Sequence, residues 1–346
     1  MPKPDTTPRR TNRRLGPGWL LLLAVSLASA AGHAQQTAPP AAPPAPSAAP
    51  RQAAAPGQTS GSPYTFKKSV DEVLIHASVF DDKNRSLTNL NKTNFSIFEN
   101  NTPQKITFFS HEDAPVSIGL VIDNSGSMRE KRPEVNEAAL NFVRASNPHD
   151  EVFIVNFNDE FYRDADFTNQ VSKLQEGLDR IESRGGTALY DALVASLDYL
   201  TQHAKNDKKV LLLITDGADN SSRYTLEEAV RYAQAEKGPL IYCVGLVSND
   251  DTRTERNRAK RAMKVLADAT GGSAYFPKNL GDVDAITRQI AAAIRDQYTL
   301  AYRSNQAQTG FRSIRVALVG SSLRHAQVRT RTGYYQGATA PATAAQ

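Results

Sequence analysis

Three short segments of the chain place oxygen-bearing side chains beside glycines, at spacings that suit the binding of a cation. The side chains concerned are Asp123, Ser125, Ser127, Thr187 and Asp216. All of them are oxygen donors, and neither histidine nor cysteine stands among them. Hard divalent cations prefer oxygen, whereas zinc and copper favour nitrogen and sulfur. The donor set therefore predicts a Mg²⁺ or Mn²⁺ site. Because few of the donors are charged, an acidic partner could complete the shell of the ion.

The elements around these segments are expected to bring them to one place. The segments with Asp123 and Asp216 each follow an apolar run typical of a strand, and Thr187 directly precedes a helical pattern. In an open doubly wound sheet, ligands bind at the carboxyl ends of the strands. We also expect Gly126 to permit the backbone geometry that directs both serines at one point.

Between residues 115 and 297, short apolar runs alternate with helical patterns. Continuous runs of Val, Ile and Leu are typical of parallel strands that are covered on both faces. A more polar stretch at 160–168 is expected to form an antiparallel edge strand. We therefore predict an α/β domain with a doubly wound, mostly parallel sheet. The predicted strands are 118–122, 152–157, 210–214, 240–246 and 274–276. One helix is predicted to begin near 133, and others to cover 171–181, 188–200, the residues after Thr225, and 258–269. A last helix is predicted where Ile286, Ile290 and Ile294 stand four residues apart and form one buried stripe.

The flanks of this region show the period of two that is typical of β-strands. Residues 64–114 read as a small antiparallel β unit, and strand patterns return within 298–336. The later strands come too late in the chain to extend the helical alternation. We expect the two flanks to pair and form one accessory β domain.

The N-terminus has the pattern of an export signal. Residues 1–14 carry five basic side chains and one acid, and an uncharged run at 19–31 follows. That run has 13 residues, fewer than the roughly 20 that a helix needs to cross a bilayer. We expect a cleaved signal peptide at 1–34 and a periplasmic or secreted protein without a stable membrane span, with a signal anchor as the alternative. Residues 35–63 read as a Pro/Ala-rich disordered linker, and 337–346 as a disordered tail.

Charge and cysteine content exclude several classes of protein. The formal net charge of +5 comes mainly from the expected signal peptide, so nucleic acid is not expected as a partner. The single cysteine, Cys243, allows neither an intramolecular disulfide nor a cysteine-based metal cluster. Its apolar neighbours predict a buried thiol. The length of 346 residues is too great for a single small domain.

Other polar residues have simpler interpretations. Asp219 and Asn220 could shape the rim of the cation site, although a solvated loop is the preferred interpretation. The basic run at 253–264 predicts a solvated helix face, with a surface for an anionic partner as the alternative. Tyr334 and its neighbour Tyr335 are expected to close the accessory sheet.

Taken together, the motifs resemble the metal-ion-dependent adhesion site of von Willebrand factor type A domains, over residues 115–297. The resemblance rests on Asp-x-Ser-x-Ser after a strand, on Gly-Gly-Thr, and on Thr-Asp-Gly after another strand. It implies that the two serines and Thr187 alternate between direct and water-mediated contact with the ion, and that Asp216 acts through water. The flanks, including Arg331-x-Gly333-Tyr334, resemble the bacterial, especially acidobacterial, von Willebrand factor A-related proteins. Those proteins usually have Asp-Gly at the turn that is Asn100-Asn101 here.

Three functions are consistent with this pattern. The leading hypothesis is an exported, non-enzymatic binding protein whose Mg²⁺ coordinates an acidic side chain of a protein partner. The second is a structural module of envelope assembly, in which the metal mainly stabilises the fold. The third is a hydrolase with Ser125 or Ser127 as nucleophile. Against the hydrolase, no histidine stands near these loops in the sequence to act as the general base, and the motif Gly-x-Ser-x-Gly is absent around them.

Overall fold

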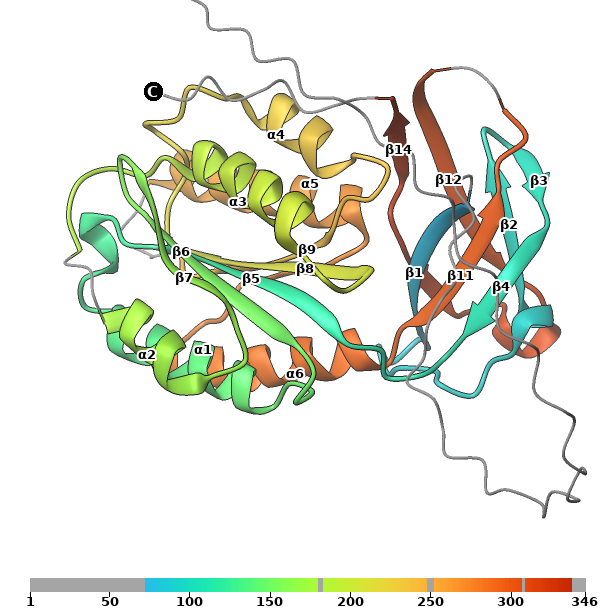
Figure 1. Ribbon diagram of the computed structural model, residues 1–346, viewed down its shortest axis with the longest axis horizontal. Helices are drawn as coiled ribbons and strands as arrows, with labels where there is room; N and C mark the ends of the chain where they lie inside the picture. The colour runs from blue at the N-terminus through green and yellow to red at the C-terminus, as the bar shows by residue number, and fades with distance from the viewer. Residues whose placement is uncertain (1–71, 180–182, 248–251, 307–308, 338–346) are drawn as a thin grey trace, which may run out of the picture. The chain divides into compact units, whose positions relative to one another are not determined.

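The structure is a computed structural model that describes residues 72–179, 183–247, 252–306 and 309–337 (Figure 1). The predicted signal peptide at 1–34, the linker at 35–63 and nearly all of the predicted tail lie outside these described residues. So do the first residues of the N-terminal β unit and the ends of some loops. No helix within the described ranges is long and apolar enough to cross a membrane.

A six-stranded sheet forms the centre of the α/β part. Its order is β10-β9-β8-β5-β6-β7, and all neighbouring pairs are parallel except β7, which runs antiparallel to β6 at the edge. The two central strands β5 and β8 consist mainly of buried apolar residues, as strands covered on both faces must. The predicted mostly parallel sheet and its antiparallel edge strand are therefore confirmed. The strands are β5 (Val116–Asp123), β6 (Glu151–Phe157), β7 (Phe161–Thr168), β8 (Lys208–Thr215), β9 (Leu240–Gly245) and β10 (Ala274–Tyr275).

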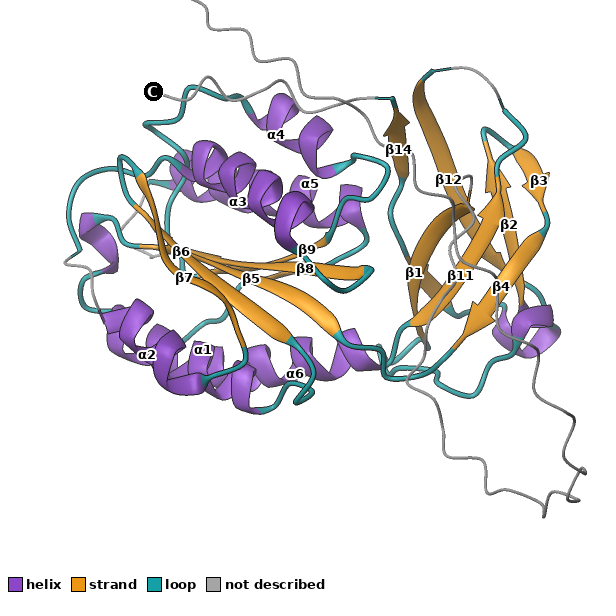
Figure 2. Ribbon diagram, viewed as in Figure 1, coloured by secondary structure: helices purple, strands orange, loops and turns teal. Residues whose placement is uncertain are grey.

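Helices cover both faces of this sheet (Figures 1 and 2). On one face lie α1 (Arg132–Arg144), α2 (Val171–Asp179) and α6 (Val283–Arg295). On the other lie α3 (Leu189–His203), α4 (Leu226–Ala233) and α5 (Arg253–Thr270). Helix α5 begins five residues before the predicted start at 258. The reason is a capping box, in which Thr252 and Glu255 each satisfy a backbone N–H of the other.

The flanks of the α/β part form two four-stranded sheets, and the expected pairing between the two flanks is present. One sheet has the order β13-β1-β11-β4 and the other β14-β12-β2-β3. Each joins early strands to late ones: β1 pairs with β11 so that Ile75 lies opposite Leu300, and β2 pairs with β12. The strands are β1 (Glu72–Phe80), β2 (Phe95–Glu99), β3 (Thr102–Gln104), β4 (Ile106–Ser110), β11 (Tyr298–Arg303), β12 (Gly310–Leu318), β13 (Gln327–Arg329) and β14 (Gly333–Gln336); short 3₁₀ helices are η1 (Lys92–Asn94), η2 (Gly126–Met128), η3 (Leu280–Asp282) and η4 (Ser321–Leu323).

A buried acid links the two β sheets. Glu99 of β2 is 0% exposed and accepts hydrogen bonds from Tyr302 at 2.9 Å, Ser304 at 2.6 Å and Tyr334 at 2.7 Å. Tyr302 belongs to one sheet, whereas Glu99 and Tyr334 belong to the other. The guanidinium of Arg312 lies 3.7 Å from the same carboxylate. These bonds satisfy an acid that would otherwise be costly to bury, and Tyr334 closes the accessory sheet as predicted.

Candidate metal centre

Asp123 stands at the carboxyl end of the central strand β5, next to the end of β8. The strands are adjacent, so Oδ2 of Asp123 accepts a hydrogen bond from the hydroxyl of Thr215 at 2.6 Å. Oδ1 accepts the backbone N–H of Ser125 at 2.8 Å. The side chain is 0% exposed. These bonds hold the carboxylate in one orientation at the start of the first loop.

The hydroxyls of the first loop connect Asp123 to the third loop. Ser125 Oγ lies 3.3 Å from Ser127 Oγ, and Ser127 Oγ donates to Oδ1 of Asp216 at 2.9 Å. Ser125 and Asp216 are buried, whereas Ser127 is exposed. The cluster therefore has one side that is open to solvent.

The second loop brings Thr187 to the same place. Its backbone N–H donates to the side-chain oxygen of Asn220 at 2.9 Å, and the N–H of Asn220 donates back to the Thr187 carbonyl at 3.0 Å. A Cβ added to Gly217, next to Asp216, would lie 3.8 Å from Thr187 Oγ1. Ser127, Thr187 and Asp216 line one hollow. The structure thus gathers all five predicted donors, and their role as metal ligands stays a prediction.

Glycines of the second loop allow this close approach. Gly185 has a φ of +74°, and a Cβ there would meet Oδ2 of Asp159 at 2.1 Å. Gly186 donates its backbone N–H to Oδ1 of Asp159 at 2.8 Å. Gly126 does not have a positive φ, so the geometry that we expected it to permit involves no left-handed backbone there. Gly126 instead donates its N–H to the Gly185 carbonyl at 3.2 Å and so ties the first loop to the second.

The two buried acids of the site, Asp123 and Asp216, would be stabilised by a nearby positive charge. Burial raises the pKa of the Asp123 carboxyl to about 6, and the charge of Asp216 acts in the same direction. Hydrogen bonds from Thr215 and Ser125 oppose that rise. A divalent cation among carboxylate and hydroxyl oxygens would favour the ionised form of Asp123. The donor chemistry therefore fits Mg²⁺ or Mn²⁺.

Several residues that shape the site were not found from the sequence. Lys131 forms an ion pair with Oδ2 of Asp216, Thr215 orients Asp123, and Asp159 holds the glycine loop. Thr215 stands directly before Asp216 and so could have been found, whereas Asp159 has no local motif. The solvated-loop interpretation was wrong for Asp219, which is buried and accepts the N–H of Tyr190 at 3.4 Å.

The hollow beside the cluster extends toward helix α5. Glu255 and Arg258 line its far side, together with Val247. Among the described residues that line it there is no histidine. The hollow therefore presents hydroxyl and carboxylate oxygens from the loops to a ligand, together with the carboxylate of Glu255 and the guanidinium of Arg258 from α5.

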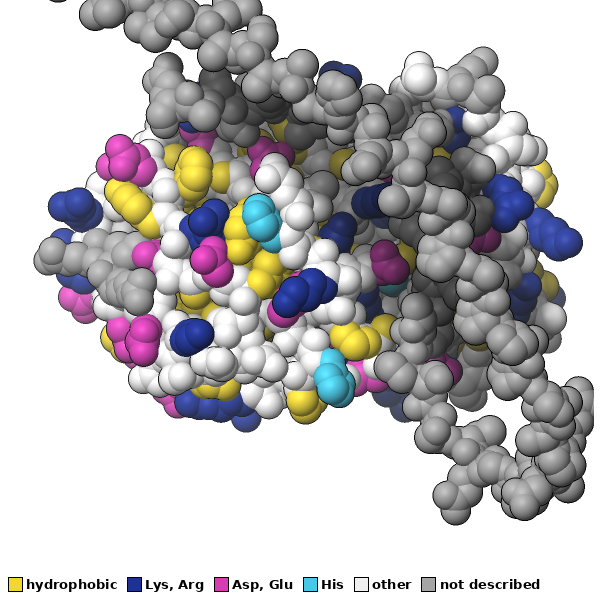
Figure 3. All heavy atoms as spheres, viewed as in Figure 1, with side chains coloured by type: hydrophobic (Ala, Val, Ile, Leu, Met, Phe, Trp, Pro, Cys, Tyr) yellow, Lys and Arg dark blue, Asp and Glu magenta, His cyan; other side chains and the backbone are white. Residues whose placement is uncertain are grey.

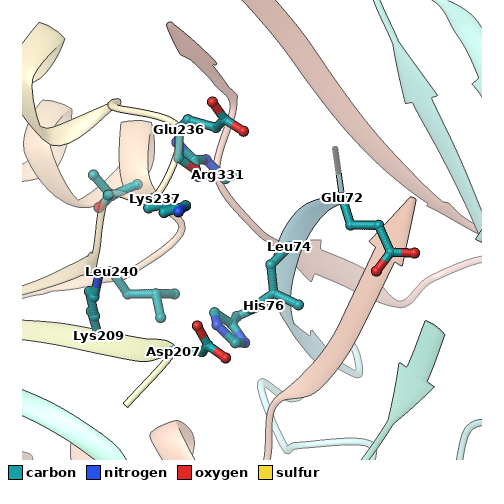
Figure 4. A pocket seen from close by; sticks show the side chains of 11 residues that line it. Glu72, Leu74, His76, Asp207, Lys209, Glu236, Lys237, Leu240 and Arg331 are labelled. Atoms are coloured by element: carbon teal, nitrogen blue, oxygen red, sulfur yellow. Dashed lines mark hydrogen bonds between the residues drawn. The ribbon is translucent and has the colours of Figure 1, made fainter. Parts of the chain in front are cut away.

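A second cavity lies where β1 approaches the strands β8 and β9, and Figure 4 shows the His76 side chain beside Asp207. Enclosure by protein atoms, with the charges of Lys208 and Arg331 acting in the same direction, lowers the pKa of His76 to about 3. Arg331 donates to the carbonyls of Ala235 at 2.5 Å and Glu236 at 2.7 Å. These contacts join the accessory strands to the α/β part. The polar residues around this cavity are therefore explained by the packing of these elements.

Neither the lone thiol nor the visible surface offers a competing site. Cys243 is buried in β9, as predicted, and burial raises its pKa. On the face shown in Figure 3, basic and acidic side chains are interspersed over the α/β part, and hydrophobic side chains form small separate groups. Among the side chains visible there, neither sign of charge predominates.

Several solved structures are similar to this chain. The von Willebrand factor domain of the pilus tip protein Mfa5 from Porphyromonas gingivalis is 15% identical, with 52% of this chain and 95% of that chain covered and a TM-score of 0.43. A von Willebrand factor type A protein from Catenulispora acidiphila is 13% identical, with 77% and 75% covered and a TM-score of 0.45. Proximal thread matrix protein 1 of the mussel byssus, with zinc in its adhesion-site motif, is 16% identical, with 57% and 50% covered and a TM-score of 0.45.

In a doubly wound sheet, ligands bind at the carboxyl ends of the strands, which is where the oxygen donors of this chain lie. The family profile described as von Willebrand factor type A domain matches residues 118–218. This match spans the first, second and third loops of the site. Residues 118–218 are therefore similar to a von Willebrand factor type A domain, as the sequence motifs indicated. No curated protein matches the sequence significantly.

Proposed function

We propose that this protein is an exported, non-enzymatic binding module whose von Willebrand factor type A domain captures a protein partner through a divalent cation. The observation that carries the proposal is the connected cluster of oxygen donors at the ends of β5 and β8. Asp123 contacts the first loop and β8, and Ser127 bonds to Asp216 across the loops. Polar clusters that depart from the local rules of a fold are expected at functional sites.

The chain's own residues would hold Mg²⁺ or Mn²⁺ through the oxygens of Asp123, Ser125, Ser127, Thr187 and Asp216. When bound, the ion supplies a coordination position that a carboxylate of the partner can fill. Ser127 is exposed, so the open side of the cluster is the side from which a partner would approach. Arg258 lines the same hollow and could pair with a further acid of that partner.

The surroundings of the serines support the proposal that the module is not an enzyme. Ser127 Oγ donates to a carboxylate, and Ser125 Oγ lies beside Ser127. Histidine, the usual base for a serine nucleophile, is not among the described residues that line the hollow. Export is supported by the charged and apolar pattern of residues 1–34.

An affinity capture tests the binding function against the structural alternative. The wild-type protein and Asp123→Asn would be immobilised and exposed to envelope extract in Mg²⁺ and in EDTA. The binding function predicts that a partner is retained only by wild type and only in Mg²⁺. If the same partner is retained equally in EDTA and by Asp123→Asn, the metal serves the fold and the structural alternative is correct.

A further inference from the structure

Lys131 places a positive charge inside the candidate metal site. Its ammonium group pairs with Oδ2 of Asp216, whose other oxygen accepts the hydroxyl hydrogen of Ser127 at 2.9 Å. The Asp216 side chain is 2% exposed and the Lys131 side chain 19% exposed, so water screens the pair only in part. One of the two acids of the site is thus already matched by a cation of the protein itself.

The position of Lys131 contradicts the local preferences of a helix. It is the N-cap residue of α1 and makes no side-chain capping bond, at a place where Ser, Thr, Asp and Asn are favoured. The positive end of the helix dipole also opposes a cation there. The backbone is fixed, because the Lys131 N–H donates to Met128 at 2.9 Å and its carbonyl accepts from Val135 at 3.1 Å. Its contact with Asp216 compensates for the unfavourable position.

The neighbouring cation behaves differently. The guanidinium of Arg132 donates to the side-chain oxygen of Asn156 at 3.1 Å and to the carbonyl of Leu178 at 3.0 Å. Of these two adjacent basic residues, Lys131 is therefore the one that contacts a candidate metal ligand.

We propose that Lys131 competes with the divalent cation for Asp216 and so sets the cation concentration at which the site fills. This inference rests on the metal site of the proposed function. Asp123 and Asp216 together carry two negative charges when ionised, and the ammonium of Lys131 offsets one of them. A divalent cation is therefore attracted less strongly than it would be by the two acids alone.

Metal titrations of matched variants test this competition. Calorimetry with Mg²⁺, and the electron paramagnetic resonance of free Mn²⁺, would give the Kd of wild type, Lys131→Met and Lys131→Gln. We expect both substitutions to lower Kd by about tenfold or more, where tenfold corresponds to about 1.4 kcal/mol. The control Lys173→Met removes an exposed lysine of α2 and is expected to leave Kd unchanged. Lys131→Arg keeps the charge and is expected to keep Kd near that of wild type.

A stability measurement gives a second readout that does not require a change in affinity. In EDTA, Lys131→Met is expected to melt below wild type, because Asp216 loses its cation. In saturating Mg²⁺ that deficit is expected to shrink, since the ion then supplies the positive charge.

The outcomes separate this inference from the proposed function. If Asp123→Asn abolishes metal binding while both Lys131 variants bind no more tightly than wild type, the competition is refuted and the metal site stands. If wild type, Lys131→Met and Lys131→Gln all fail to bind Mg²⁺ and Mn²⁺, both proposals are wrong.

Discussion

Replacing Asp123 by Asn should stabilise the metal-free protein, although it destroys the proposed site. Burial raises the pKa of Asp123 to about 6 from a usual value of 3.8. Each unit of that difference is worth about 1.4 kcal/mol at 25 °C, so ionisation of the folded protein at pH 7 costs about 3 kcal/mol. The Asn side chain keeps an oxygen for the Ser125 N–H and an amide beside Thr215. Because the amide of Asn cannot accept the hydroxyl hydrogen that Thr215 donates to Asp123, part of this is lost, and we expect a net gain of about 1–2 kcal/mol.

The same pKa shift determines how the contribution of Asp123 to the free energy of unfolding changes with pH. The folded-state pKa of Asp123 is raised, so the folded protein holds its proton more tightly than the unfolded chain does between pH 3.8 and about 6. The contribution of Asp123 is therefore fully present below pH 3.8 and is lost as the pH rises through about 6. In Asp123→Asn this contribution is absent.

Chemical denaturation in EDTA at several pH values measures the difference directly. The free energy of unfolding of Asp123→Asn minus that of wild type should grow as the pH rises from 4 to 7 and then level off. Carboxyls far from Asp123 titrate in both proteins and cancel in the difference. A variant that is less stable than wild type at pH 7, or a difference that does not change with pH, would refute the electrostatic reasoning.

Three further substitutions test other parts of the account. Gly185→Ala strains a backbone with a φ of +74°, and its new Cβ collides with the Asp159 carboxylate. We expect the free energy of unfolding to fall by about 1–3 kcal/mol and Mg²⁺ binding in calorimetry to weaken. Unchanged binding would contradict the role of this loop. Glu99→Ala removes the acceptor of three hydroxyls and should lower the unfolding free energy by about 3–5 kcal/mol without changing Mg²⁺ affinity. Arg331→Ala leaves two carbonyls without their donor and should cost about 2 kcal/mol or more in denaturant unfolding; a neutral effect would show that these bonds do not stabilise the junction.

The sequence predicted the fold well, because the deciding signals are local. The apolar runs of β5 and β8 are nearly continuous and buried on both faces, and such runs indicate parallel strands without further information. Acids placed directly after two of these strands must then lie at the same edge of the sheet. The donors Asp123 and Asp216 could be found in this way from spacing alone.

What the sequence could not predict depends on contacts between distant residues. Lys131 reads as an ordinary basic residue at the start of a helix, and only the folded chain shows its pairing with Asp216, 85 residues away. The bond from the Gly126 N–H to the Gly185 carbonyl likewise joins two loops that are far apart in the sequence, and no local motif indicates it. Asp219 was interpreted as solvated because its loop is polar, yet its carboxylate accepts a backbone N–H in the interior.

The capture mechanism depends on one claim, that the five gathered oxygen donors hold a divalent cation. Anomalous diffraction from a crystal grown in Mn²⁺ tests that claim most directly. The account predicts a single strong Mn²⁺ peak among Asp123, Ser125, Ser127, Thr187 and Asp216, and its loss in crystals of Asp123→Asn. A map without a peak at these oxygens, at saturating Mn²⁺, would contradict the account.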